Sequence, residues 1–315
     1  MATTDTWSNP NYAGELFLVG KNRTPFLSAI GGLNGGKVVS AMDFPVASPW
    51  SLDAASQPAI TETASLTAPA NNNYTRGQDL NTCQIYMESI YVSYAKLSTP
   101  GAIKADLSNG LTAAGTNPVQ NEVDFQVMAS LQQVARDVNY TFLNGVYVQA
   151  TAANVAAKTR GMLTAITTNT TSGTGAGGAL QKADINTALI ALADGGAPFD
   201  NMVAVCGAYQ KTVLSTLYGV QPRDWNVGGV NITRIETDFA PLGVMYDPDM
   251  PTDTILLVDM AYVSPVFCPV PGKGVLFYEE LARTGAGVKG QIYGQIGLDY
   301  GPEEYHAKIT GLATS

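Results

Sequence analysis

The amino-acid sequence predicts an α+β protein organised around one long helix, and three patterns carry this prediction. Apolar residues recur every three or four positions between 118 and 149, as they do on one face of a helix. Residues 83–95 alternate between two sets of side chains, as in a β-strand. Residues 181–261 alternate between helical and strand-like segments, which is typical of an α/β unit. The 315 residues allow one large domain or two smaller ones.

The composition narrows the range of functions. Charged residues make up 14% of the chain, against a usual share of about 25%, so we expect partners to cover much of the outer surface. The net charge is −9 and no run of Lys or Arg occurs, which argues against a nucleic-acid-binding surface. The scattered Cys83, Cys206 and Cys268 are expected to be reduced and mostly buried. Neither a signal-peptide pattern nor a membrane-spanning apolar run is found, so neither secretion nor a membrane span is expected.

Residues 10–33 are expected to form a short helical arm. Thr24 and Pro25 suit an N-cap and the first helical position. Phe26, Leu27 and Ile30 then form an apolar face, which two glycines end. Because so short a helix buries little by itself, it needs another surface on which to lie.

Residues 38–97 are expected to form a long β-hairpin. Two strand-like flanks, 38–47 and 83–95, enclose a long segment rich in Ser, Thr, Ala, Asn and Pro. Both faces of the second flank carry apolar side chains, so we expect the hairpin to be covered on both sides. A structureless loop of this length is unusual inside a compact domain, so the tip is expected to reach a neighbouring molecule.

The helix predicted over residues 118–149 is the strongest local signal. Asn117 and Pro118 supply an N-cap and a first helical residue, and Glu122 and Asp124 suit the positive end of the helix dipole. A helix of about 28 residues would be ~42 Å long, which few globular domains need. The apolar stripe consists of Val119, Val123, Val127, Leu131, Val134, Val138, Phe142 and Val146.

The second half of the chain predicts a compact α/β unit followed by further strands. The expected elements are helices over 182–194 and 208–218 and strands over 202–206, 230–236, 243–247, 254–260, 263–270, 274–278, 291–300 and 305–312.

The only histidine, His306, is the first candidate for catalysis. Alternation along the last predicted strand places it on the polar face with Lys308 and Thr310. A histidine-based triad also needs a positioned nucleophile and an orienting acid, and the G-x-S-x-G motif is missing. We therefore expect His306 to have no catalytic role.

Two further patterns are candidates for ligand binding. Residues 173–178 match the G-x-G-x-x-G spacing of dinucleotide-binding loops, but no buried strand precedes them, so a flexible loop is expected. Asp247, Asp249 and Asp253 could hold a divalent cation through oxygen ligands, although the neighbouring prolines favour a solvated turn. The sequence therefore predicts no catalytic, cofactor-binding or metal-binding residues and no small-molecule substrate.

Five segments resemble the major capsid proteins of tailed bacteriophages, which have the Hong Kong 97-type fold. "RTPFLSAIGG" (23–32) looks like the N-terminal arm of that family. "TETASLTAP" (61–69) and "YTRGQDLNTCQIY" (74–86) look like its extended loop. "IETDFAPLGVMYDPDMP" (235–251) resembles the apical segment, and "FYEELARTGAGVKGQIYGQIGLDYGPEEYHAKITGL" (277–312) is similar to the closing strands. The order of these segments covers essentially the whole chain and is most similar to the subgroup represented by phage SU10.

The resemblance implies a division of the chain into five parts. These are an N-terminal arm (1–37), an extended loop (38–97), a peripheral domain with the spine helix (98–180), an α/β axial domain (181–261) and return strands of the peripheral domain (262–315). Because arm-like residues begin close to Met1, we expect no long scaffolding segment before the arm.

The resemblance also implies a function. The chain is expected to be a non-enzymatic major capsid protein that forms hexamers and pentamers of an icosahedral shell around double-stranded DNA, without sequence-specific binding. A separate scaffold, a portal and decoration proteins are further expected partners. The virion is the expected location, with assembly in the cytoplasm of the bacterial host. Two alternatives remain: the shell of an encapsulin-like compartment, and a tail or fibre protein.

Contacts between subunits are expected at Pro25 and Phe26 in the arm and at Tyr74 and Arg76 in the extended loop. The family's namesake links its subunits covalently through a lysine on the extended loop. This chain has no lysine between Lys37 and Lys96, and the guanidinium of Arg76 stays protonated and cannot replace a lysine amine. We therefore expect a shell without such covalent links.

Overall fold

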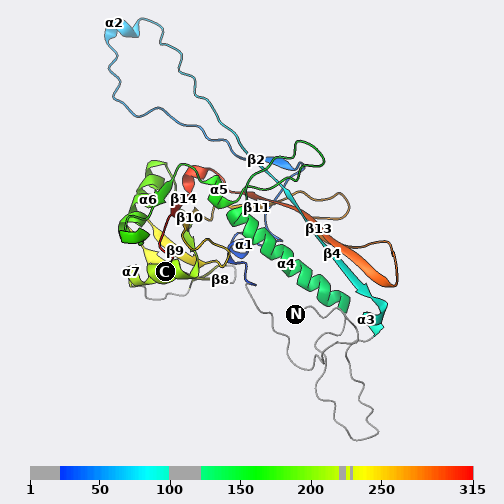
Figure 1. Cartoon of the computed structure of the whole chain (residues 1–315). Coiled ribbons are helices and arrows are strands. Elements are labelled where there is room, and N and C mark those ends of the chain that lie inside the picture. Colours follow the sequence, from blue (N-terminus) through cyan, green and yellow to red (C-terminus); the bar gives the residue numbers. More distant parts are fainter. Residues whose placement is uncertain (1–21, 99–121, 220–224, 228–229, 315) are drawn as a thin grey trace.

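The chain folds around two large β-sheets, a small two-stranded sheet, one long helix and a loop that extends far from the rest of the molecule (Figure 1). The computed structural model describes residues 22–98, 122–219, 225–227 and 230–314. Within these residues no helix combines the length and apolar character needed to cross a membrane.

The first sheet has five strands, and its central strand is β13 (Gly287–Asp299). The strands that pair with β13 are β4 (Gln84–Ser93), β12 (Leu276–Glu280) and β11 (Ser264–Phe267), and the short β1 (Lys37–Val38) pairs with β11. The expected pairing within a hairpin over 38–97 is therefore wrong for its second flank. β4 pairs along its whole length with β13, some 200 positions away, and not with the first flank.

The spine helix α4 (Glu122–Asn144) packs across this sheet (Figure 1). The buried Val134, Val138 and Phe142 confirm the inward stripe over the described part of the helix. The predicted end at residue 149 is wrong, because the helix ends at Asn144 and the exposed Val146 follows it. Asn117 and Pro118, the expected start, lie outside the described residues.

Gly145 directly follows the last residue of α4. A Cβ atom at this position would lie 2.5 Å from the carbonyl oxygen of Thr141 and 2.6 Å from that of Thr159, so the backbone passes where only glycine fits. The chain then leads through α5 (Met162–Ala165) toward the second sheet.

The second sheet has seven strands in the order β5-β14-β10-β6-β9-β8-β7. Their bounds are β5 (Thr170–Ser172), β14 (Ala307–Thr310), β10 (Ile255–Asp259), β6 (Met202–Cys206), β9 (Pro241–Tyr246), β8 (Val230–Glu236) and β7 (Trp225–Val227). The helices α6 (Lys182–Asp194) and α7 (Ala208–Tyr218) have the predicted bounds, and so does β6.

The structure divides the closing strands between the two sheets. β11, β12 and β13 belong to the five-stranded sheet, as expected of return strands. β14 instead pairs with β10 and β5 in the seven-stranded sheet, so the assignment of the whole range 262–315 to one domain needs correction at residues 307–310. The predicted strand 305–312 is also shorter, because the 3₁₀ helix η4 (Glu303–Tyr305) precedes it.

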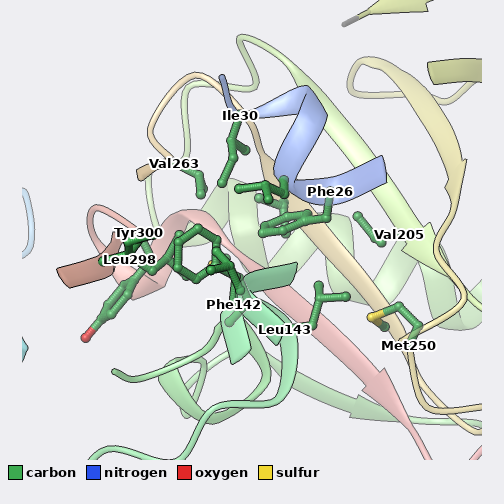
Figure 2. Close-up of a cluster of buried hydrophobic side chains, with 14 of the residues drawn as sticks. Phe26, Ile30, Phe142, Leu143, Val205, Met250, Val263, Leu298 and Tyr300 are labelled. Carbon is green, nitrogen blue, oxygen red and sulfur yellow. The ribbon is translucent and has the colours of Figure 1, made fainter. Parts of the chain in front are cut away.

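The arm helix α1 (Pro25–Ala29) is part of the main hydrophobic core. Figure 2 shows Phe26 and Ile30 among side chains from distant parts of the chain, including Phe142 of α4 and Val205 of β6. Thr24 takes the expected N-cap position, but its side chain makes no capping hydrogen bond. The arm is therefore held by the core around it and not by its own cap.

Candidate assembly surfaces

The extended loop is anchored to the body of the protein by a short β-ladder. β2 (Asp43–Ala47) pairs with β3 (Asp79–Thr82), and Phe44 of β2 is buried against a small cluster beside the five-stranded sheet. Further out, Trp50 and Arg76 form an isolated β-bridge, and the amide of Gly77 donates to the carbonyl of Pro49 over 2.9 Å. The loop is thus a defined projection from a rigid base.

Beyond the bridge, every residue from 50 to 78 is exposed. The segment includes large apolar side chains such as Ile60, exposed at 72%, and Leu66, exposed at 85% beside the short helix α2 (Glu62–Ser65). Figure 1 shows this loop reaching well away from both sheets. Since a soluble monomer gains nothing by exposing such side chains on a projecting loop, the segment has the character of a surface that another molecule covers.

Tyr74 and Arg76 lie together on the returning arm of this loop. Both are exposed, and the Tyr74 ring makes an edge-on contact with the Trp50 ring at 6.5 Å between centroids. Both side chains lie on the surface of this chain, and their contact with a neighbouring subunit stays a prediction.

Pro25 and Phe26 are placed differently. Both are buried in the core of their own chain, and Phe26 has 0% of its surface exposed. Their side chains therefore cannot contact a neighbouring subunit while the core is intact, so the expectation for these two residues needs correction. These apolar side chains pack in the core of their own chain. A single sequence does not distinguish an apolar residue of the core from one of an interface.

The outer face of β4 is a second apolar surface. Tyr86, Ile90 and Val92 point inward and are buried, whereas Ile85, Met87 and Tyr91 on the opposite face are exposed. Within one chain only the inner face of β4 is covered, and a cover over its outer face stays a prediction.

A buried polar cluster joins the arm, the spine helix and the second sheet. Its centre is Asn139 of α4, which is fully buried. The Asn139 side-chain oxygen accepts the amide proton of Leu27 over 3.0 Å, and its NH₂ group donates to the carboxylates of Asp247 at 3.2 Å and Asp249 at 2.9 Å. Asp247 also accepts the amide proton of Phe26 over 3.2 Å. The cluster therefore holds the two first-turn amides of α1 that lack partners within their own helix.

This cluster gives the aspartates of the sequence YDPDMPTD a structural role. Burial raises the pKa of the Asp247 carboxyl, and hydrogen bonds from Asp249 and Asn139 act in the opposite direction. Asp253 lies apart from the cluster and accepts a hydrogen bond from the hydroxyl of Thr254. Within the described residues no group of three acidic, cysteine or histidine side chains is arranged to hold a metal ion. The signal that sequence reasoning missed is Asn139, a polar residue beside Val138 on the inward side of α4.

His306 is fully buried, so its expected place on a polar strand face is wrong. Its Nδ1 accepts the amide proton of Asp259 over 3.2 Å, and its Nε2 lies 2.6 Å from the carbonyl oxygen of Tyr300. Both ring nitrogens are therefore occupied by backbone groups. This arrangement suits a structural histidine and not a general base, which must reach a substrate.

The remaining candidate groups are also parts of the packing. Burial raises the pKa of Cys83 and of Cys206 to about 12, which keeps both as unreactive thiols, and Cys268 is half-buried. The residues of the G-x-G-x-x-G match form a turn in which the Gly175 amide donates to the carbonyl of Ala179. At Gly173 a Cβ atom would lie 2.9 Å from the carbonyl oxygen of Gly178, so close packing of the backbone accounts for that glycine.

The combination of spine helix, two sheets and projecting loop defines the Hong Kong 97-type capsid fold, and solved structures confirm it. The capsid subunit of cyanophage A-1(L) is similar with a TM-score of 0.65 at 13% identity, covering 99% of each chain. The capsid of a native GTA particle gives 0.59 at 16% identity, covering 98% of this chain and 97% of that one. The SrpI encapsulin complex of Synechococcus elongatus PCC 7942 gives 0.60 at 12% identity, covering 100% and 98%.

The sequence assigns the family within this fold. Residues 1–313 match the family described as SU10 major capsid protein. The chain therefore belongs to this family, and it is a major capsid protein of a tailed phage. No match was found among curated proteins.

Proposed function

We propose that this chain assembles with copies of itself, as hexamers and pentamers, into the icosahedral shell that encloses the double-stranded DNA of a tailed phage. The supporting observation is the exposed segment 50–78, in which Ile60 and Leu66 present 72% and 85% of their surface to solvent. Such side chains are stable in a shell because a neighbouring copy removes them from water, at roughly 25 cal/mol per Å² of apolar surface.

The surface that receives this loop is proposed to be the outer face of β4 in the neighbouring subunit. Ile85, Met87 and Tyr91 form an exposed apolar row there, and the loop supplies Ile60 and Leu66. Both surfaces carry few charges, so burying them against each other leaves few ionic groups without solvent. Tyr74 and Arg76, near the base of the loop, are proposed to supply polar contacts at the edge of the interface.

The proposed domain division follows the two sheets. The five-stranded sheet with α4 forms the peripheral domain, and the seven-stranded sheet with α6 and α7 forms the axial domain, to which residues 170–172 and 307–310 are added. The chain is proposed to act as a structural protein without enzymatic activity, located in the virion after assembly in the host cytoplasm. A scaffold, a portal and decoration proteins are proposed partners, and the enclosed DNA is held without sequence-specific contacts.

Electron microscopy of two matched double variants tests this function. Ile60→Asp with Leu66→Asp places two charges on the apolar loop positions, whereas Gln57→Asp with Thr67→Asp places two charges on exposed polar positions of the same loop. We expect the first variant to remain folded but form no closed particles, and the second to assemble like the unaltered chain. Closed particles of normal size from the first variant would contradict the proposed role of the loop.

The content of purified particles separates a virion from an encapsulin-like compartment. The fold is shared by both, since the SrpI encapsulin is among the similar structures. We expect nuclease-protected double-stranded DNA in particles from infected cells. Particles that contain a cargo enzyme and no DNA would favour the compartment. The family assignment removes the tail or fibre alternative.

A further inference from the structure

The only histidine of the chain lies where the two sheets meet. Tyr300 follows the end of β13 in the five-stranded sheet, whereas Asp259 is the last residue of β10 in the seven-stranded sheet. The His306 ring bonds to the backbone of both, through Nε2 to the Tyr300 carbonyl at 2.6 Å and through Nδ1 to the Asp259 amide at 3.2 Å. One imidazole thus connects the main strand of one sheet to the other sheet.

The ring also extends the ladder between β10 and β14. Leu257 and Ala307 form the last paired positions of these two strands. The next residues diverge, and the His306 side chain takes the place of a strand partner for the amide of Asp259. Since the ring is fully buried, water cannot replace it as the acceptor of that amide proton.

These contacts define the protonation state of the ring. A backbone amide only donates, so Nδ1 must be the unprotonated acceptor, and a carbonyl only accepts, so Nε2 must carry the proton. The ring is therefore a neutral imidazole with one proton, held in one tautomer by two backbone groups.

The charged groups around the ring do not offer it a partner for a second proton. The Asp259 carboxylate accepts the amide protons of Asp200, Asn201 and Ala261, at 2.9 to 3.1 Å. Glu303 in η4 is engaged by the amides and hydroxyls of two threonines, with its pKa held low by these hydrogen bonds.

Two further charged groups on neighbouring elements are engaged elsewhere. Asp299 of β13 accepts the amide proton of Gly301 and pairs with Lys37, while Lys308 of β14 donates to the carbonyl of Leu163. Burial lowers the pKa of His306 below its ordinary value of 6.5, and the hydrogen bond to the Tyr300 backbone and the attraction of Asp259 and Glu303 offset this only in part.

We propose that His306 is a proton-sensitive link between the two sheets. The neutral ring joins them through its two hydrogen bonds, and protonation of the ring opens the junction between them. A second proton on Nδ1 would face the Asp259 amide, so two donors would point at each other and that hydrogen bond would be lost. The cation would also lack the water that solvates an exposed imidazolium. The low-energy response is to open the junction and hydrate the ring.

The stability of the junction between the two sheets is expected to decrease as the pH falls. The native state holds His306 neutral, whereas the unfolded chain binds a proton near pH 6.5. The two hydrogen bonds of His306 therefore contribute their full stabilisation of the folded state above that pH, and this contribution is lost as the pH falls. The equilibrium constant for opening is expected to increase by up to about tenfold for each pH unit below the ordinary pKa, until the native ring also titrates.

The proposal is tested by measuring the melting temperature of the full-length chain between about pH 8 and about pH 5.5. This range spans the ordinary pKa of histidine. We expect the melting temperature of the unaltered chain to fall below about pH 6.5 and that of His306→Gln, which cannot titrate, to stay level. The control Lys308→Gln removes a charge two residues away and leaves the imidazole in place, so it should keep the pH dependence. An equal pH dependence in His306→Gln and the unaltered chain would overturn the proposal.

If His306→Gln fails to fold, deuterium exchange at the C2 position of the imidazole tests whether the ring is buried and neutral in the unaltered chain. Because the chain has a single histidine, mass spectrometry of the unaltered protein reports this ring alone. We expect exchange that is at least about tenfold slower than in the unfolded chain, with its midpoint below pH 6.5. Exchange at the rate and midpoint of a free imidazole would show that the ring is not held as described. Both measurements concern the folded subunit, so they stand apart from the outcome of the assembly experiments.

Discussion

Replacing Asn139 with leucine should weaken the attachment of the arm to the spine helix and destabilise the subunit. Leucine has a similar volume but no polar atoms, so the change removes hydrogen bonds with little change in packing. The Leu27 amide would lose its acceptor, and the buried carboxylate of Asp247 would lose a donor. A buried polar group without a partner costs about 1–3 kcal/mol, and the loss of one hydrogen bond to a charged group costs about 1.5–3 kcal/mol. Asp247 keeps the amides of Phe26 and Asp249 as donors. The expected loss is therefore about 3–5 kcal/mol.

The assay is urea unfolding of the full-length chain, with all proteins compared in the same assembly state. We expect Asn139→Leu to lower the midpoint with little change in the slope, since the surface exposed on unfolding stays the same. Gln132→Leu is the matched control, because Gln132 is exposed on the same helix and the change should cost less than about 0.5 kcal/mol. The reasoning would be refuted if the two variants unfolded at the same urea concentration.

The pH dependence of this variant gives a second check. The Asn139 hydrogen bond lowers the pKa of Asp247, so its removal should raise that pKa further above its ordinary value. A carboxyl with a raised pKa in the folded state binds protons more readily there than in the unfolded chain. Acidification should therefore protonate Asp247 in the variant and reduce the difference in stability from the unaltered chain. A defect that grows as the pH falls would contradict this account.

Three further predictions follow from burial and composition. Phe26→Ala should cost about 3–5 kcal/mol in unfolding experiments because the ring is fully buried; a smaller loss than about 1 kcal/mol would place the arm outside the core. Boiled particles should give a single band at 33.1 kDa on a denaturing gel, since no lysine lies between Lys37 and Lys96; a ladder of larger species would reveal covalent links. Cys83 and Cys206 should react with a thiol reagent only after unfolding; labelling of either in the native protein would contradict their burial.

Local signals in the sequence were sufficient for the elements whose stability is local. The helix over 182–194 and the helix over 208–218 have the predicted bounds, because a periodic apolar face and a terminal glycine define each of them. The buried strand 202–206 is an uninterrupted apolar run, and it too is confirmed. The resemblance to tailed-phage capsid proteins relied on the order of such segments, and the family match confirms it.

Pairing between distant strands was decided only by the tertiary structure. Alternation identified 83–95 as a strand, but it contains no information about the partner, and β4 pairs with β13 instead of returning along the hairpin. The last strand likewise joins the seven-stranded sheet through β10 and β5. The pattern of one strand records which side chains are buried and not which segment buries them.

The roles of the polar residues also depended on the tertiary structure. The aspartates at 247 and 249 resemble a cation site in the sequence, yet the Asn139 side chain and the Phe26 amide donate hydrogen bonds to the buried carboxylate of Asp247. His306 appears beside polar residues in the sequence, yet it is buried between two backbone groups that the fold brings to it. The role of a buried polar side chain depends on its hydrogen-bond partners, and in this protein those partners come from positions far along the chain. The sequence therefore determined the family and the local elements, whereas the fold alone determined which polar groups hold the two sheets and the arm together.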